Sequence, residues 1–296
     1  MNGLNLARRD LLRTAAASAA LLTSGFAAIT LDAISSPAHA ETTLDRLRKQ
    51  GYARIAIANE LPFTEVKPDG KVSGAAVEVA RAVLKKLGIP DVVASVSEYG
   101  AMIPGLQAGR FDLVAAGLFI KPDRCAAVLF SEPDLCDSEG FIIKKGNPLK
   151  VESFADIAKN PKVRMGTPGG GTEEKLALEA GTPRDRVIVL PDAQSGITML
   201  QDGRIDVYAL PALSLRSLLQ KAKDPSLELF TPVKGTPIYC AGAAFRKSDA
   251  KFRDAYDKVL AELKKDGEFK KIIEPWGFSA ETTAMVTRKE LCNRKS

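Results

Sequence analysis

Histidine is nearly missing from this chain: among its 296 residues, only position 39 is a histidine. Nucleophilic triads of the Ser-His and Cys-His kinds need an imidazole as their base, and many metal sites use imidazole ligands. We therefore expect no catalytic residue of this type, no metal and no cofactor in the chain beyond His39. Aromatic residues make up only 6% of the sequence, so a cluster of them is informative.

A strong excess of one charge is also lacking, because 42 Lys and Arg stand against 36 Asp and Glu, a formal net charge of +6. The basic residues form no block interleaved with aromatics, the pattern typical of nucleic-acid-binding surfaces. We expect no nucleic-acid partner. The 45% of hydrophobic and 26% of charged residues are typical of a globular protein. The length suggests about two domains.

The N-terminal segment is predicted to be an export signal. Its uncharged, alanine-rich stretch at residues 14–31 is short and only weakly apolar for a membrane span. Arg8 and Arg9 precede this stretch and resemble a twin-arginine signal, although the general secretory route stays open. The Ala38-His39-Ala40 sequence offers a cleavage site. We expect residues 1–40 to be removed near Ala40. The product would be a soluble periplasmic protein of net charge +5, since three arginines and two aspartates leave with the signal.

The four cysteines are an even number in an exported chain, and none belongs to a C-x-x-C motif. This pattern favours two disulfides over a redox or zinc site. The sequence allows three pairings, and we prefer near neighbours, Cys125 with Cys136 and Cys240 with Cys292.

Beyond Glu41 the sequence alternates strand-like and helix-like segments, which favours α/β lobes. The phrase LQAGRFDL at residues 106–113 recurs as LQDGRIDV at residues 200–207. In each copy a helix ends at a glycine and the chain turns into a buried strand, which indicates two lobes of similar plan. The predicted strands are residues 54–58, 92–96, 111–116, 163–166, 187–190, 205–210 and 227–230. The predicted helices are residues 73–87, 101–108, 172–180, 195–201 and 248–273.

The long helical region near the C-terminus is expected to complete the first lobe. Residues 41–137 plus 239–296 then form lobe 1, and residues 138–238 form lobe 2. Two crossings between the lobes, at about residues 137–140 and 237–241, make a hinge.

Residues of useful chemistry follow the predicted strands of the first lobe. Ligands of open α/β sheets bind beyond the carboxyl ends of the strands. The residues at these positions are Glu60, Phe63, Tyr99, Gly117, Phe119 and Arg124. An arginine can hold a carboxylate through two parallel hydrogen bonds, and aromatic faces attract a cation. The combination predicts a site for a small zwitterion.

A glycine-rich loop at residues 169–171 leads into a predicted helix of the second lobe. Thr172 is a natural N-cap for that helix, and the free backbone N–H groups of the helix could bind an anionic group. A phosphate-binding loop is disfavoured, because no Gly-Lys-Ser/Thr follows and Glu173 and Glu174 would repel phosphate.

These residues resemble a known family, the solute-binding proteins of polar amino-acid and compatible-solute ABC transporters. The similarity covers essentially the whole chain beyond residue 40. It is carried by the phrases ELPF at 60–63, KPDR at 121–124, FSEP at 130–133 and GGT at 170–172. Within the family the chain is most similar to members that bind ectoine and hydroxyectoine, through SEYGAMIPGL at 97–106, GGGTEEKL at 169–176 and IIEP at 272–275.

The resemblance implies a type II periplasmic binding protein: two α/β lobes, a hinge of two crossovers and a ligand in the cleft between the lobes. It implies no enzyme activity, a monomer, and two partners, namely ectoine or hydroxyectoine and the permease subunits of an ABC transporter. Phe63, Tyr99 and Phe119 would enclose the positively charged ring of the solute. Glu60 would bind the ring nitrogen, and Arg124 and Thr172 would grip the carboxylate from opposite lobes.

One departure from ordinary amino-acid binders concerns the end of the strand at residues 205–210. These proteins commonly place an acidic residue there for the α-ammonium group, and this chain has Pro211, which we expect to be a ligand-binding residue. Asp192 could replace that acid, so a polar amino acid or a betaine stays an alternative ligand. A periplasmic dehydratase-like enzyme is a further alternative, in which Glu60 or Glu173 would act as the acid or base.

Overall fold

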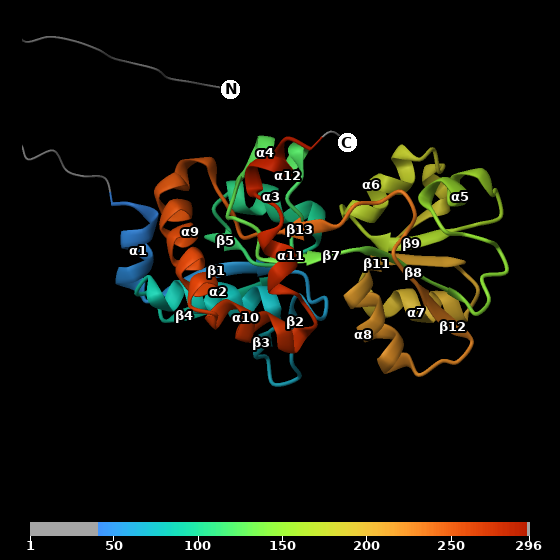
Figure 1. Ribbon diagram of the computed structural model, residues 1–296, viewed down its shortest axis with the longest axis horizontal. Coiled ribbons are helices and arrows are strands. Elements are labelled where there is room, and N and C mark those ends of the chain that lie inside the picture. Colours follow the sequence, from blue (N-terminus) through green and yellow to red (C-terminus); the bar gives the residue numbers. More distant parts are fainter. Residues whose placement is uncertain (1–40, 295–296) are drawn as a thin grey trace, which may run out of the picture. The chain divides into compact units, whose positions relative to one another are not determined.

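The computed structural model describes residues 41–294 (Figure 1). The predicted export signal, residues 1–40, lies outside the described residues. Within residues 41–294, none of the helices combines the length and the apolar character that a membrane crossing needs.

Two five-stranded mixed sheets form the cores of two lobes. The first sheet has the order β4-β1-β5-β14-β6, and its strands are β1 (Tyr52–Ile57), β4 (Asp91–Val96), β5 (Leu113–Val114), β6 (Leu129–Phe130) and β14 (Ala244–Phe245). The second has the order β10-β9-β11-β8-β12, and its strands are β8 (Glu139–Lys144), β9 (Met165–Pro168), β10 (Val187–Leu190), β11 (Val207–Pro211) and β12 (Leu227–Phe230). We call the lobes built on these sheets the first and the second lobe.

Both sheets follow the same plan, which is what the repeated sequence phrase predicts. In the first lobe β4, β1 and β5 are parallel and β14 runs antiparallel to β5. In the second lobe β10, β9 and β11 are parallel and β8 runs antiparallel to β11. The exact lobe limits at residues 137–139 and 237–239 stay a prediction. All strands of the second sheet fall between Glu139 and Phe230.

Helices cover both faces of each sheet (Figure 1). In the first lobe they are α1 (Thr43–Gln50), α2 (Ala75–Lys86), α3 (Tyr99–Gln107), α4 (Pro122–Ala127), α9 (Ala250–Lys265), α10 (Glu268–Ile273), α11 (Ala280–Ala284) and α12 (Arg288–Cys292). In the second lobe they are α5 (Phe154–Lys159), α6 (Thr172–Glu179), α7 (Ala193–Gln201) and α8 (Ala212–Ala222). Figure 1 shows α5 and α6 on one face of the second sheet and α7 and α8 on the other. Each face has its own apolar core.

The predicted elements are present, with shifted ends. The helix predicted at residues 101–108 already begins at Tyr99, and the strand predicted at 111–116 is regular only over Leu113–Val114. The single helix predicted at 248–273 is divided into α9 and α10. The break follows from Gly267, whose φ of 77° lies in the left-handed region that a helix cannot continue through.

The preferred disulfide pairing is wrong. The structure joins Cys136 to Cys240 and Cys125 to Cys292. The first bond follows from the antiparallel pairing of β7 (Leu135–Asp137) with β13 (Tyr239–Ala241), whose register places the two cysteines opposite each other. The second bond joins α4 to α12. Sequence proximity failed as a guide because Cys125 and Cys136 belong to elements that pack against different partners.

The aspartate of the repeated phrase makes the same backbone hydrogen bond at the start of β5 and of β11. The carboxylate of Asp112 accepts hydrogen bonds from the backbone N–H of Arg54, at 2.8 Å, and from the guanidinium groups of Arg54 and Arg46. Asp206 accepts the equivalent backbone bond from Arg164, at 2.9 Å, together with its side-chain Nε. In both lobes the aspartate therefore ties a parallel strand to its central neighbour.

Asp112→Asn should lower the free energy of unfolding by about 2 to 3 kcal/mol, because its fully buried carboxylate is the partner of two arginines. Asp206→Asn is the matched control in the second lobe. It should cost less than about 1 kcal/mol, because its side chain is 21% exposed and pairs with a 43% exposed Arg164. Urea unfolding of both variants measures the difference.

The pH dependence of stability has a defined sign at this site. Burial acts to raise the pKa of Asp112, but the hydrogen bonds from Arg54 and Arg46 hold it below its usual value. The stabilisation is therefore complete above the pKa of an unfolded aspartate and is lost as the pH falls through the folded value. An equal loss of unfolding free energy in Asp112→Asn and Asp206→Asn would contradict the expectation that Asp112 contributes more to stability.

Two glycines allow close contact between the lobes. The backbone N–H of Gly100 in α3 donates to the carbonyl of Gly169 at 3.4 Å. A Cβ on Gly170 would lie 2.4 Å from the Cα and N atoms of Gly100, which is far inside van der Waals contact. Gly170 also has a φ of 72°, which favours glycine.

Gly170→Ala should hold the lobes apart without unfolding either of them. Gly109→Ala is a matched control, because Gly109 has the same φ of 72° but a Cβ there would meet no atom within 4 Å. Both variants should lose about 1 kcal/mol of stability from backbone strain. Fluorescence energy transfer between labels on the two lobes should show a longer mean distance in Gly170→Ala alone. The same distance in both variants would show that this contact does not control closure.

Candidate functional site

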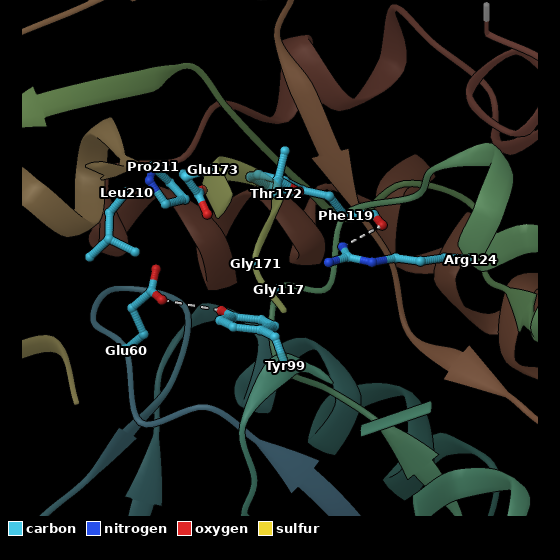
Figure 2. A pocket seen from close by; sticks show the side chains of 10 residues that line it. All are labelled: Glu60, Tyr99, Gly117, Phe119, Arg124, Gly171, Thr172, Glu173, Leu210 and Pro211. Atoms are coloured by element: carbon cyan, nitrogen blue, oxygen red, sulfur yellow. Dashed lines mark hydrogen bonds between the residues drawn. The ribbon is translucent and has the colours of Figure 1, made fainter. Parts of the chain in front are cut away.

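A cavity lies between the two lobes, where the carboxyl ends of the strands of the two sheets face each other. Figure 2 shows its side chains pointing toward one another, with Glu60 and Arg124 at opposite ends. The first lobe contributes Glu60, Tyr99, Gly117, Phe119 and Arg124, and the second contributes Gly171, Thr172, Glu173, Leu210 and Pro211.

Seven of the eight predicted binding residues line this cavity, and Phe63 does not. The ring of Phe63 is 1% exposed and packs edge-on against Phe278, with centroids 4.8 Å apart. It stands behind Phe119, at a centroid distance of 6.3 Å. Phe63 leaves room only for a glycine at position 117, because a Cβ on Gly117 would lie 2.3 Å from the Phe63 ring. The structure thus places Phe63 as a support for the cavity wall.

Glu60 provides a buried carboxyl group at one end of the cavity. It follows β1, is 3% exposed, and its Oε1 accepts a hydrogen bond of 2.6 Å from the Ser214 hydroxyl. The Tyr99 hydroxyl donates toward Oε2 at 3.3 Å (Figure 2). Burial raises the pKa of Glu60 to about 8, although the hydrogen bond from Ser214 lowers it. A cation in the cavity would favour the ionised form of this carboxyl.

Arg124 provides the opposite charge at the other end. Its Nη1 donates to the carbonyl of Phe119 at 3.0 Å, and its Nη2 donates across the lobes to the carbonyl of Gly170 at 3.2 Å. Burial lowers the pKa of the Arg124 guanidinium, while Asp123 and Glu173 raise it. An arginine nevertheless stays charged in proteins, and two of its five N–H donors are used in these bonds. The guanidinium plane is therefore fixed and can still bind a carboxylate.

The prediction that Thr172 caps helix α6 is wrong. Gly171 occupies the N-cap position, and Thr172 is the first helical residue. The loop is held instead by Glu174, whose carboxylate accepts from the backbone N–H of Gly170 at 2.5 Å. The Thr172 hydroxyl is buried and has no hydrogen-bond partner among the described residues. Because Thr172 lines the cavity, this hydroxyl can serve a bound solute.

A pair of carboxyl groups forms part of the second-lobe wall. Glu173 lines the cavity, and Glu139, the first residue of β8, lies with it in the interior at 0% exposure. Neither carboxyl oxygen of Glu139 has a hydrogen-bond donor among residues 41–294. Burial and the charge of Glu173 raise the pKa of Glu139 well above its usual value, and burial also raises that of Glu173. Burial thus favours the protonated forms of both carboxyl groups.

Several lining or supporting residues were not among the predicted binding residues. Glu139 and Ser214 carry no sequence signal, because each belongs to an ordinary strand or helix and reaches the site only through the packing of the lobes. Gly171 ends the glycine-rich loop, and Glu173 follows Thr172 in the first turn of α6. Asp192, considered as a substitute acid, lies outside the cavity and caps α7 by accepting from the Ser195 N–H at 2.8 Å.

The site therefore presents a carboxyl group and a guanidinium at opposite ends of a cavity with aromatic and apolar walls. This arrangement suits a small molecule with one positive and one negative end. The charged ends would be recognised by Glu60 and Arg124, and the Tyr99 and Phe119 rings would contact the body between them.

Comparison with known proteins agrees with this architecture. Residues 53–279 match the family of bacterial extracellular solute-binding proteins, family 3. The crystal structure of EhuB in complex with hydroxyectoine is similar, with 65% identity and a TM-score of 0.85. The match covers 86% of this chain and 99% of that one.

Two curated relatives extend the comparison. A probable amino-acid ABC transporter periplasmic-binding protein of Sinorhizobium fredii is 36% identical over 95% of this chain and 97% of its own length. The cyclohexadienyl dehydratase of Pseudomonas aeruginosa is 26% identical over 86% of this chain and 93% of its own. With the family match spanning most of its length and a two-lobed fold around a charged cleft, this chain belongs to the family 3 bacterial extracellular solute-binding proteins.

Proposed function

We propose that this protein is an extracytoplasmic receptor that binds ectoine or hydroxyectoine and delivers it to the permease of an ABC transporter. The observation that carries the proposal is the placement of Glu60 and Arg124 at opposite ends of one buried cavity with aromatic walls. Ectoine has a cyclic amidinium and a carboxylate, so it matches both ends. The 65% identity with EhuB, crystallised with hydroxyectoine, supports the choice.

In the proposed complex, Glu60 accepts a hydrogen bond from a ring nitrogen of the solute. Tyr99 and Phe119 contact the faces of the charged ring, and Phe63 supports them from behind. Arg124 and Thr172 bind the carboxylate from opposite lobes, so the bound solute stabilises the closed arrangement. A ligand that touches both lobes shifts the equilibrium toward closure by its differential affinity for the closed state.

The walls of the cavity favour a cyclic cation over the primary ammonium of an amino acid. Leu210 and Pro211, at the end of β11, give that part of the second-lobe wall an apolar surface. A primary ammonium needs several hydrogen-bond acceptors, whereas a delocalised cation is satisfied by aromatic faces and one carboxylate. We further propose that the protein acts as a monomer in the periplasm, that residues 1–40 are its export signal and that it has no enzyme activity.

Calorimetric titration of the purified protein with ectoine, hydroxyectoine, glycine betaine, proline and arginine tests the proposed solute. We expect tight binding of ectoine or hydroxyectoine and weak or absent binding of the other three. The recovered solute should be chemically unchanged, which separates a receptor from a dehydratase-like enzyme. Binding of an amino acid alone, or conversion of the solute, would reject the proposal.

Arg124→Ala should weaken ectoine binding by about 3 kcal/mol, roughly a hundredfold, because a buried carboxylate loses its charged partner. Arg124→Lys is the control, because it keeps the charge but cannot make the same pair of parallel hydrogen bonds. Its loss should be intermediate. Calorimetry measures both affinities, and near-normal binding by Arg124→Ala in a folded protein would remove Arg124 from the site.

A further inference from the structure

Ser214 connects the second lobe to the carboxyl group of Glu60 in the first. It lies in the first turn of α8 and is 0% exposed. Its hydroxyl donates to Glu60 Oε1 at 2.6 Å, a bond between residues separated by 154 positions in the chain. Since Glu60 follows β1 of the first sheet, this hydrogen bond bridges the two lobes.

The N-terminus of α8 is anchored to the hinge. The backbone N–H of Leu213 donates to Asp137 Oδ2 at 2.8 Å, and the N–H of Ala212 donates to the carbonyl of Ser138 at 2.8 Å. Asp137 ends β7, and Ser138 joins β7 to β8. A change in the hinge therefore moves Ser214 relative to Glu60.

The two donors around Glu60 differ in origin. The Tyr99 hydroxyl, which donates toward Oε2, belongs to the same lobe as Glu60. The Ser214 hydroxyl reaches Oε1 only from the second lobe. Without it, one oxygen of a 3% exposed carboxyl would lose its strongest donor, and hydrogen bonds to the ionised form are what stabilise it against burial.

We propose that Ser214 is a positioning residue that completes the cation-binding end of the site when the lobes close. Its hydroxyl orients the Glu60 carboxyl and stabilises the ionised form that a cationic solute requires. Recognition of the cation and closure of the lobes are then one coupled event. The inference rests on the proposed function, in which Glu60 binds the positive end of the solute.

Other groups around Glu60 set the background for its titration. Ser214 and Tyr99 lower the pKa of Glu60 through hydrogen bonds, while Glu173 of α6 and Asp137 of the hinge raise it through their charge. Burial raises the pKa of the Tyr208 phenol in β11, and the charge of Glu60 raises it further. Among the described residues, Ser214 is the only one of the second lobe that donates a hydrogen bond to the Glu60 carboxyl.

The test compares three variants with the wild type. Each is titrated from pH 6 to pH 9.5 with one solute, chosen from ectoine, hydroxyectoine, glycine betaine, proline and arginine as the one that the wild type binds most tightly. Ser214→Ala removes the hydroxyl, and Ser214→Thr restores one. Ser217→Ala is the matched control, because Ser217 lies on the same helix and its hydroxyl donates to the Leu213 carbonyl within that helix. Calorimetry gives the affinity, and stopped-flow fluorescence gives the association and dissociation rates.

We expect Ser214→Ala to bind on the order of tenfold more weakly at pH 7, mainly through faster dissociation. Affinity should rise with pH as Glu60 ionises, and in Ser214→Ala this rise should move to higher pH, because the lost hydrogen bond no longer lowers the pKa of Glu60. Ser214→Thr should restore the wild-type profile, and Ser217→Ala should keep it. A merely structural role would lower stability without moving the pH profile.

Three outcomes overturn different statements. If the wild type binds a solute and folded Ser214→Ala has the same affinity and pH profile, the role of Ser214 is rejected while the proposed function stands. If Ser214→Ala does not fold, the Glu60→Gln variant is titrated instead. A rise of its affinity with pH like that of the wild type would not come from Glu60, and it would reject the inference. If the wild type binds none of the five solutes, the proposed function is rejected, and the inference falls with it.

Discussion

The placement of a carboxyl group and a guanidinium group in one narrow cleft is the constraint on which the site depends. Neither Glu60 nor Arg124 could be placed there at low cost without partners, because a charge removed from water needs hydrogen bonds or a counter-ion. The chain meets this need from both lobes: Ser214 donates to Glu60, and the Gly170 carbonyl accepts from Arg124. Closure thus assembles the polar environment that both charged groups require.

The scaffold that brings these groups together is built twice from the same plan. In each lobe an aspartate directly before the central strand, Asp112 or Asp206, accepts a backbone N–H from the neighbouring segment, that of Arg54 in β1 or of Arg164 just before β9. This arrangement keeps parallel strands in register, so their carboxyl ends point to a common edge. The cleft lies where these two edges face each other. Glycines at positions 100 and 170 let the two backbones come close enough for the cleft to close.

Much of this could be predicted from single residues at the ends of strands. Glu60, Tyr99, Phe119 and Arg124 all line the cavity as their positions after predicted strands indicate. An aromatic residue after a strand can face the cleft or the core; Phe63 packs against Phe278 and Phe119, so its contact with a solute stays a prediction. The α6 cap was misassigned by one residue, since Gly171 adopts the required backbone conformation and Thr172 enters the helix.

The sequence by itself determined the alternation of strands and helices, the duplicated plan and the opposite charges at the strand ends. These features depend on local propensity and on the periodicity of apolar residues, which are written in consecutive positions. Only the tertiary structure decided the disulfide partners, the pairing of Glu139 with Glu173 and the bond from Ser214 to Glu60. Each of these joins residues far apart in the chain, and their contact depends on how strands pair and how two lobes meet across a hinge.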